Sequence, residues 1–273
     1  MKRSAGVIAV DVGNTAVKLS LRSNTLAAAS TATGIAEAVS HDAIHHSFAL
    51  DRSRWCESVT DWIRQQSGGS GDGEVYQWRI GSVNQRASDQ LRKQIEKSFP
   101  LSTPRLISFR DVPMEIDVDS PDQLGIDRLL SAFAARNRYA SPLVVIDAGS
   151  AVTVDLVNAS GAFVGGAILP GLTLQTTALT MGTAALPTID WMNSDVVSIP
   201  GRNTVGAIRL GVLTSVTASI DRLIAHYSAG LSEAEQPPVV ILCGGDAAVI
   251  SPHIQSKHVT HAHLVCQGLL DLA

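Results

Sequence analysis

The sequence predicts a mixed α/β fold built from two related halves. Residues 7–19 read VIAVDVGNTAVKL, and residues 143–155 read LVVIDAGSAVTVD. Superposing Asp11 on Asp147 aligns an apolar run, a D-x-G-[NS] turn and a second, alternating run. The offset of 136 residues is close to half of the 273-residue chain, which indicates a duplication in which each half begins with two strands and a tight turn. The rest of the chain alternates apolar runs with amphipathic stretches, as α/β proteins do.

The first predicted half covers residues 1–120. Its strand candidates are short apolar runs, and its helix candidates repeat apolar residues at three- and four-residue spacing. A segment rich in Ser and Gly at 67–73 predicts a flexible loop between two of them. The predicted elements are strands near 6–11, 15–22 and 75–80 and helices near 54–66 and 87–98.

The second predicted half, residues 121–273, opens on a helix-start pattern. Ser120 is a good N-cap, Pro121 suits the first helical position, and Gln123 follows the cap by three residues. These signals predict a helix over 121–138. The further elements are strands near 143–148, 151–157, 162–168 and 239–242, helices near 172–181 and 205–227, and an alanine-rich helix after Gly244-Gly245-Asp246.

Composition and charge exclude several classes of protein. Lys and Arg number 21 against 25 for Asp and Glu, so the net charge is −4, and no basic stripe suggests a nucleic-acid partner. No apolar run approaches the ~18 residues that span a bilayer, so no membrane association is expected. The three cysteines are scattered and lack metal or redox spacing, which fits a reducing cytoplasmic location.

The D-x-G turn at Asp11 is a candidate phosphate site. Gly13 lets the backbone approach a bound group, and the hydroxyl of Thr15 or the amide of Asn14 can donate to phosphate oxygens. A Mg²⁺ ion would separate the Asp11 carboxylate from the phosphates. A plain hairpin with an Asx turn explains one copy equally well, but the second copy at half-chain spacing favours the phosphate site.

Two other segments carry candidate chemistry. In Gly125-Ile126-Asp127-Arg128, Asp127 could accept a hydroxyl proton, and the planar fork of Arg128 could hold a carboxylate; two solvated charges on a helix are the alternative. An interior helical Gly125 costs roughly 1 kcal/mol and favours the first interpretation. The turn at Gly244-Gly245-Asp246 is weak evidence for a nucleotide, because ordinary loops often have the same composition.

Six motifs follow one another along nearly the entire chain: Asp11-Val-Gly-Asn-Thr-x-x-Lys18, Gly125-x-Asp-Arg128, Asp147-x-Gly-Ser-Ala-x-Thr-x-Asp155, Gly166-x-x-x-Pro-Gly171, Thr183-Ala-x-Leu-Pro187 and Gly244-Gly-Asp246. Taken together and in this order, they resemble type III pantothenate kinase. That resemblance implies the fold of the acetate/sugar kinase, Hsp70 and actin superfamily: two duplicated ribonuclease-H-like (actin-like ATPase) halves with an interdomain nucleotide cleft.

The resemblance also implies an activity, the phosphorylation of pantothenate to 4'-phosphopantothenate with ATP and Mg²⁺ in the first step of coenzyme A biosynthesis. Asp127 matches the proton acceptor, Asp147 the ligand of a monovalent cation (K⁺ or NH₄⁺), and Ser150 a second phosphate contact. Pantothenate would contact Gly125, Ile126, Asp127, Arg128 and Thr204. The ATP-binding segment would be Asp11, Val12, Gly13, Asn14, Thr15, Ala16, Val17 and Lys18.

Two positions depart from the family pattern. Ser150 stands where members usually have Thr, and Val118 stands where many have a substrate-contacting Tyr. A kinase of the same fold acting on another small hydroxy acid, or a non-catalytic ATP-binding transcription accessory factor, are the alternatives. The family is typically a homodimer with the substrate site near the subunit interface, and the helix predicted over 205–227 is a candidate interface element.

Overall fold

The computed structural model describes residues 4–23, 43–66, 75–191, 198–231 and 236–273; the loop predicted at 67–73 lies outside them. The chain divides into two compact units. Unit 1 comprises Met1–Pro113, Asp122–Ala134 and Val265–Ala273, and unit 2 comprises Met114–Pro121 and Ala135–Leu264. The sequence predicted a single division after residue 120. The grouping in the structure differs, because two segments that follow that point, Asp122–Ala134 and Val265–Ala273, belong to unit 1.

Unit 1 is built on a five-stranded sheet of order β3-β2-β1-β4-β5. The three strands β1, β2 and β3 are antiparallel neighbours, whereas β4 and β5 run parallel to β1. The sequence predicted β1, β2 and β4 but neither edge strand, because β3 is half exposed without a clean alternation and β5 is only three residues long. The strands are β1 (Ser4–Val12), β2 (Ala16–Ser23), β3 (Ala43–Ala49), β4 (Val75–Ser82) and β5 (Pro104–Leu106).

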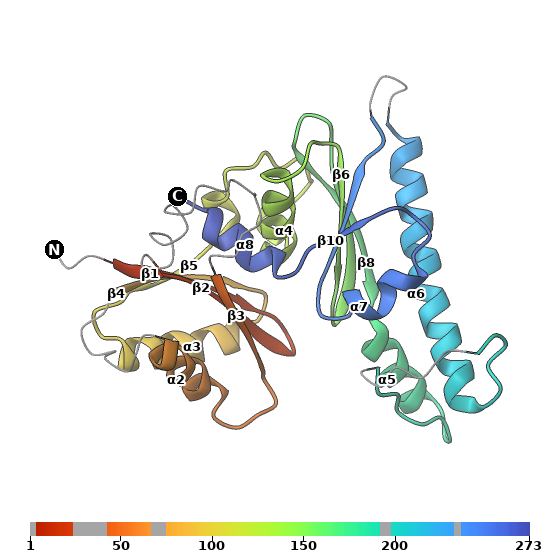
Figure 1. Ribbon diagram of the computed structural model, residues 1–273, viewed down its shortest axis with the longest axis horizontal. Helices are drawn as coiled ribbons and strands as arrows, with labels where there is room; N and C mark the ends of the chain where they lie inside the picture. Colours follow the sequence, from red (N-terminus) through yellow and green to blue (C-terminus); the bar gives the residue numbers. More distant parts are fainter. Residues whose placement is uncertain (1–3, 24–42, 67–74, 192–197, 232–235) are drawn as a thin grey trace, which may run out of the picture. The chain divides into compact units, whose positions relative to one another are not determined.

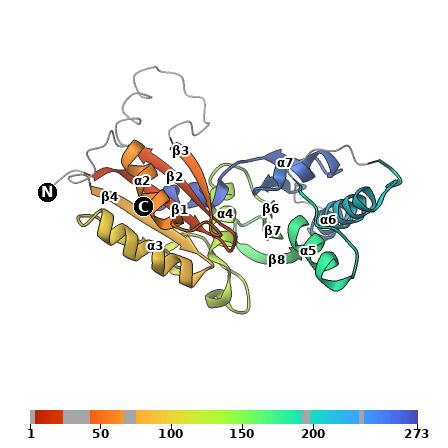
Figure 2. The same ribbon diagram turned by 90° about the horizontal axis from the view of Figure 1, so that it is seen from below.

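Helices α2 (Trp55–Gln66) and α3 (Gln85–Ser98) cover one face of this sheet (Figure 2). The Asn84 side chain accepts from the backbone N–H of Ala87 and caps α3, which satisfies one of the orphan donors at its first turn. The inward faces of both helices pack on the aliphatic strands. The fully buried members of this core include Val10, Leu19, Val59, Ile63, Ile80, Leu91 and Ile95.

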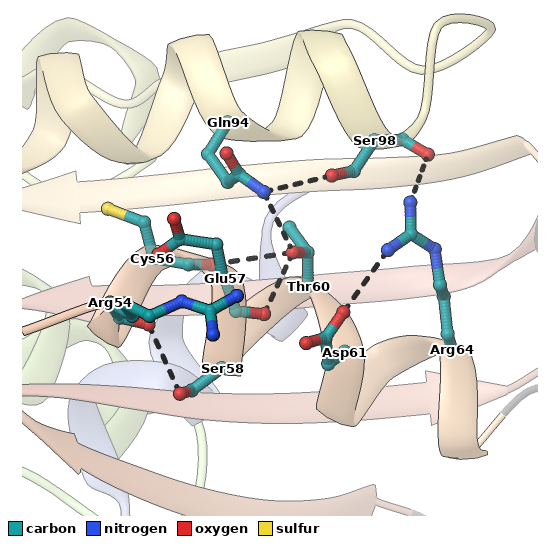
Figure 3. A network of polar contacts seen from close by, with 9 residues as sticks. All are labelled: Arg54, Cys56, Glu57, Ser58, Thr60, Asp61, Arg64, Gln94 and Ser98. Atoms are coloured by element: carbon teal, nitrogen blue, oxygen red, sulfur yellow. Dashed lines mark hydrogen bonds and ion pairs between the residues drawn. The ribbon is translucent and has the colours of Figure 1, made fainter.

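A polar network joins α2 to α3 (Figure 3). The buried Thr60 hydroxyl donates to the carbonyl of Glu57 at 3.0 Å and accepts from the Gln94 amide at 3.3 Å. Gln94 also donates to the Ser98 hydroxyl at 3.1 Å, and Arg64 donates to the Ser98 carbonyl at 3.2 Å. These bonds satisfy polar groups between two packed helices, so the network serves the fold of unit 1.

Helices α4 (Ile126–Arg136) and α8 (Leu264–Asp271) meet β4 at Gly81. A Cβ atom there would lie 2.9 Å from a methyl group of Leu130 and 3.7 Å from one of Leu269, so the missing side chain admits both helices. For α4, the prediction that the helix starts at residue 121 with Ser120 as its cap is wrong. Residues Pro121–Gln123 form a separate 3-10 turn, and α4 begins five residues later.

Unit 2 repeats the architecture of unit 1. Its sheet has the order β10-β9-β6-β7-β8, which from β8 to β10 reproduces the sequence of antiparallel and parallel pairings seen from β3 to β5. Its first hairpin, β6 to β7, has the predicted bounds. The strands are β6 (Leu143–Ala148), β7 (Ala151–Val157), β8 (Phe163–Pro170), β9 (Val239–Cys243) and β10 (Val259–Thr260).

In the described part of unit 2, α5 (Leu172–Gly182) and α6 (Thr204–Ala229) come between β8 and β9 in the chain, and α7 (Ala247–Ile250) comes between β9 and β10. Figure 1 shows α6 as the longest helix, running beside the sheet of its unit. Its buried side joins the strands in one core that includes Ile146, Val154, Ile208, Val212, Val216 and Ile220.

The predicted α/β class is confirmed, and the two five-stranded sheets repeat one strand order, as the duplication in the sequence predicted. Among the described helices, none combines the length and apolar character that a membrane span needs.

Candidate active site

The hairpin between β1 and β2 forms the candidate phosphate site of unit 1. The N–H of Gly13 donates to the Ala16 carbonyl at 3.0 Å and closes the turn. Asn14 and Thr15 at its tip are exposed, so their polar groups face solvent where a phosphate could reach them. The tip of the turn is therefore exposed, although the Gly13 N–H and the Thr15 carbonyl are already hydrogen-bonded to backbone groups.

Asp11 and Lys18 form an ion pair beneath this turn. The two residues are directly opposite in the β1–β2 register, and Lys18 Nζ lies 3.7 Å from an Asp11 carboxylate oxygen. Asp11 is buried and Lys18 is half exposed. A buried carboxylate is costly unless it is paired, so Lys18 stabilises the charge of Asp11 while its ammonium group remains partly accessible.

Cys266 of α8 lies directly against the same hairpin. Its Sγ–H donates to the carbonyl oxygen of Lys18 at 3.5 Å. Burial raises the pKa of the Cys266 thiol to about 12, and the negative charge of Asp11 adds to this effect. The thiol therefore keeps its proton and remains a donor at neutral pH.

The hairpin between β6 and β7 repeats this construction in unit 2. Gly149 donates to the Ala151 carbonyl at 3.0 Å, as Gly13 does to Ala16. The second turn is one residue shorter, because Ala148 faces Val152 whereas Val12 faces Val17. Ser150, the predicted phosphate contact, is exposed at its tip.

In each unit, the carbonyl of the residue after the hairpin aspartate accepts a hydrogen bond from a backbone N–H in the loop that follows the adjoining parallel strand. The Val83 N–H donates to the Val12 carbonyl at 3.1 Å, and the Asp246 N–H donates to the Ala148 carbonyl at 2.9 Å. These bonds fix the loop after β4 to the first turn and the loop after β9 to the second.

Two glycines of unit 2 are required for this close approach. A Cβ atom at Gly171 would lie less than 3.0 Å from the backbone of Gly149 and Ser150, and one at Gly244 would lie equally close to the backbone of Ala148. Gly244 also has a φ of +101°, which favours glycine. The sequence showed both as Pro-Gly or Gly-Gly turns, but not that both pack against one hairpin.

Asp147 differs from Asp11 in its cross-strand partner. The residue opposite Asp147 is the neutral Thr153, whereas Asp11 faces Lys18. The Thr153 hydroxyl oxygen is buried, and within the described ranges it makes no hydrogen bond. A carboxylate beside an unsatisfied hydroxyl is a suitable pair of oxygen ligands for a cation. No cluster of three or more His, Cys, Asp or Glu among the described residues could bind a metal ion.

The N-terminus of α4 carries the candidate catalytic group. Asp127 Oδ1 accepts the N–H of Arg128 at 2.8 Å, one of the donors left open at a helix start. A Cβ atom at Gly125 would lie 2.7 Å from Asp127 Oδ1, so a side chain there would force the carboxylate to turn away from its present position. Gly125 thus precedes α4; the prediction that it lies inside the helix is wrong, although the inferred close approach is present.

Thr204 is the first residue of α6 and is exposed in unit 2. It lines a cavity of about 820 Å³ between α5 and α6, together with Pro170, Thr183 and Leu186. These three residues belong to the motifs Gly166-x-x-x-Pro-Gly171 and Thr183-Ala-x-Leu-Pro187. The structure brings the motifs and Thr204 together around one apolar cavity.

The predicted site residues therefore fall into two groups. Unit 1 contains the segment from Asp11 to Lys18 and the segment from Gly125 to Arg128. Unit 2 contains Asp147 and Ser150 on one hairpin, and Thr204 on α6. Val118, the residue that departs from the family pattern, belongs to unit 2 and lies 3.9 Å from the Cβ position of Gly165.

Comparison with known proteins identifies relatives along almost the whole chain. The family described as type III pantothenate kinase matches residues 7–226. A protein of that name from Rhodopirellula baltica is 37% identical over 97% of both chains. Another from Persephonella marina is 31% identical over 81% of this chain and 87% of its own length. A third, from Acidiphilium cryptum, is 35% identical over 80% of this chain and 79% of its own length.

Solved structures share the fold at low sequence identity. A protein described as a Baf family transcriptional activator, from Campylobacter jejuni, superposes with a TM-score of 0.54 and 17% identity over 96% of this chain and 94% of its own. The activator of 2-hydroxyisocaproyl-CoA dehydratase from Clostridium difficile, with bound ADPNP, superposes with a TM-score of 0.51 and 13% identity, over 98% of this chain and 92% of its own. The matching family, the relatives and the duplicated hairpins agree: this chain belongs to the type III pantothenate kinase family.

Proposed function

We propose that this chain catalyses the ATP-dependent phosphorylation of pantothenate to 4'-phosphopantothenate, the first step of coenzyme A biosynthesis. The observation that carries the proposal is the pair of matching D-x-G hairpins, in a chain that also presents an aspartate and an arginine at one helix N-terminus. Family membership supplies the substrate.

The hairpins would bind the phosphates of ATP. Residues 11–18 offer the exposed backbone and side chains of the first turn, and Ser150 offers a hydroxyl at the tip of the second. Magnesium prefers oxygen ligands from one or two carboxylates together with substrate phosphates, and the Asp11 carboxylate at the base of the turn fits that requirement. When bound, Mg²⁺ neutralises charge on the phosphates.

Asp147 would bind the monovalent cation, K⁺ or NH₄⁺. Its neutral cross-strand partner Thr153 and the unsatisfied hydroxyl of that residue support this role. In the first hairpin, by contrast, Lys18 already supplies a positive charge.

Asp127 would accept the proton of the pantothenate primary hydroxyl. One of its oxygens is held by the helix N–H, and no hydrogen bond with another described residue occupies the other. As the O–H bond breaks, the proton passes to Asp127 and the oxygen forms a bond to the γ-phosphorus; the bond from that phosphorus to the bridging oxygen breaks and releases ADP. Positioning and electrostatics supply most of the rate in such transfers.

The remaining substrate contacts would come from Gly125, Ile126, Arg128 and Thr204. The guanidinium of Arg128 adjoins Asp127 in the chain and can bind the pantothenate carboxylate in a bidentate manner. Thr204 is exposed and lines the cavity between α5 and α6, where its hydroxyl could contact the substrate.

We also propose a homodimer that forms through α5 and α6. Both helices expose large apolar side chains, among them Leu174, Leu179, Met181 (83% exposed) and Val205. Patches of this kind mark interaction sites, and a second copy of the chain would cover them. A molar mass of one chain in light scattering at micromolar concentration would contradict this. Three free cysteines agree with a reducing, cytoplasmic setting.

The test is a coupled assay of ADP release with and without pantothenate, in K⁺ and then in Na⁺. We expect turnover that requires pantothenate and is faster in K⁺. Asp127→Asn should lower kcat at least about 100-fold, the usual value of a general base, and leave ATP affinity nearly unchanged. Turnover that ignores pantothenate, or an Asp127→Asn enzyme with full activity, would overturn the assignment.

A further inference from the structure

The last helix, α8, contacts two parts of unit 1 that carry proposed site residues. Through Cys266, which is 1% exposed, it donates a hydrogen bond to the backbone of Lys18 in the phosphate hairpin. Through Gly268 it touches the backbone of α4. No motif in the sequence marked this helix, because its run of aliphatic residues resembles any buried segment.

The contact at Gly268 leaves no free space. A Cβ atom there would lie less than 3.0 Å from the Leu130 carbonyl oxygen, 3.0 Å from its carbonyl carbon and 3.2 Å from its Cα. All three are backbone atoms, so the clash could be relieved only by a shift of a helix. Leu130 lies three residues after Asp127, within one turn of α4, so a shift of this turn would also move the carboxylate.

The other end of α8 is fixed by two arginines. Arg79 of β4 donates to the carbonyls of Leu269, Leu270 and Leu272, and Arg22 of β2 donates to the Leu270 carbonyl at 2.7 Å. Cationic groups at the C-terminal carbonyls of a helix satisfy open acceptors and complement its dipole. Because both arginines come from the sheet, α8 cannot slide along it.

We infer that α8 is a positioning element, in which Cys266 holds the phosphate hairpin and Gly268 sets the distance to the helix that carries Asp127. The inference rests on the roles proposed above for the hairpin and for Asp127. It assigns a function in the reaction to the C-terminal segment, which none of the family motifs includes.

The main test is Gly268→Ala. A misplacement of about 1 Å can cost on the order of 100-fold in rate, so we expect kcat to fall at least about tenfold, with ATP affinity by calorimetry within about threefold of wild type. Ile63→Ala is the matched control, since Ile63 is fully buried in unit 1 among the core residues of α2 and α3. It should lower the melting temperature but keep kcat when assayed well below it.

Cys266 provides a second test that does not depend on whether Gly268→Ala folds. Cys266→Ala should raise the KM for ATP several-fold with kcat within about twofold, whereas Cys266→Ser keeps a donor and should restore the wild-type KM. Either an unchanged KM in Cys266→Ala or an unchanged kcat in folded Gly268→Ala would overturn the positioning role. Asp127→Asn, assayed alongside, separates the two proposals: full turnover in that variant refutes the proton acceptor, and wild-type behaviour of the α8 variants refutes only the positioning role.

Discussion

Gly244 and Gly245 are adjacent in sequence but differ sharply in what a side chain would meet. At Gly244, φ is +101°, and a Cβ atom would lie less than 3.0 Å from three backbone atoms of Ala148. At Gly245 the Cβ atom would have nothing within 4 Å. The substitutions Gly244→Ala and Gly245→Ala therefore separate a required glycine from a tolerant one within a single turn.

The expected cost of Gly244→Ala has two parts. A non-glycine residue in this region of φ costs about 1–3 kcal/mol, and forcing an extra carbon into packed backbone costs about 1–3 kcal/mol more. Since neither strain can relax without moving the end of β6, we expect the free energy of unfolding to fall by about 2–6 kcal/mol. Gly245→Ala should change it by less than about 0.5 kcal/mol.

Urea denaturation followed by circular dichroism measures both values, and calorimetric titration with ATP measures the effect on the site. Because the Gly244 turn packs against the hairpin of Ser150, Gly244→Ala should also weaken ATP binding at temperatures where it is folded. The close approach of this turn to β6 is refuted if the free energy of unfolding of Gly244→Ala lies within 0.5 kcal/mol of the wild-type value. It is also refuted if Gly245→Ala lowers that free energy as much as Gly244→Ala does.

Two further predictions concern stability. Burial lowers the pKa of His45 from its usual 6.5, so the folded chain binds a proton at this imidazole less readily than the unfolded chain does. The contribution of neutral His45 to the free energy of unfolding is therefore complete above about pH 6.5 and is lost as the pH falls through the folded-state pKa. His45→Gln should therefore reduce the loss of unfolding free energy between pH 7.5 and 5.5, and an unchanged loss would contradict the linkage. The Asn203 side chain accepts from the Gly206 N–H at 2.7 Å, so Asn203→Ala should cost about 1 kcal/mol in urea denaturation; Asn203→Asp should keep the cap, and equal losses in both variants would refute it.

The elements that the sequence predicted well are those whose boundaries are set locally. The strands β6 and β7 have the predicted limits because a continuous apolar run starts after Pro142 and a D-x-G turn separates the two. The start of α4 was predicted wrongly because Ser120 and Pro121 do begin a helical turn, but only a 3-10 one. The space that Asp127 needs beside Gly125 depends on side-chain geometry, which no local pattern reveals.

The parts of the site that could not be predicted depend on contacts between distant segments. The repeat located both hairpins, but Gly171 and Gly244 meet the second hairpin only once the sheet has formed. The helix α8 pairs with a hairpin about 250 residues earlier in the chain, and its sequence contains no periodic pattern that would indicate this. The motifs and the family resemblance therefore proposed candidate residues for the chemistry, but they did not indicate the glycines and the helix that pack against those residues.

The two hairpins of this duplicated fold give their aspartates different chemical surroundings. Both turns are closed by a glycine N–H, of Gly13 in one and of Gly149 in the other, although the second turn is one residue shorter, and each aspartate occupies the same place near the end of the first strand. What differs is the residue directly across the sheet: Lys18 in one unit, Thr153 in the other. A lysine supplies a positive charge from the opposite strand, whereas a threonine supplies only a neutral oxygen ligand there. If Asp147 binds a monovalent cation as proposed above, that dependence would follow from one cross-strand position rather than from a separate metal-binding motif.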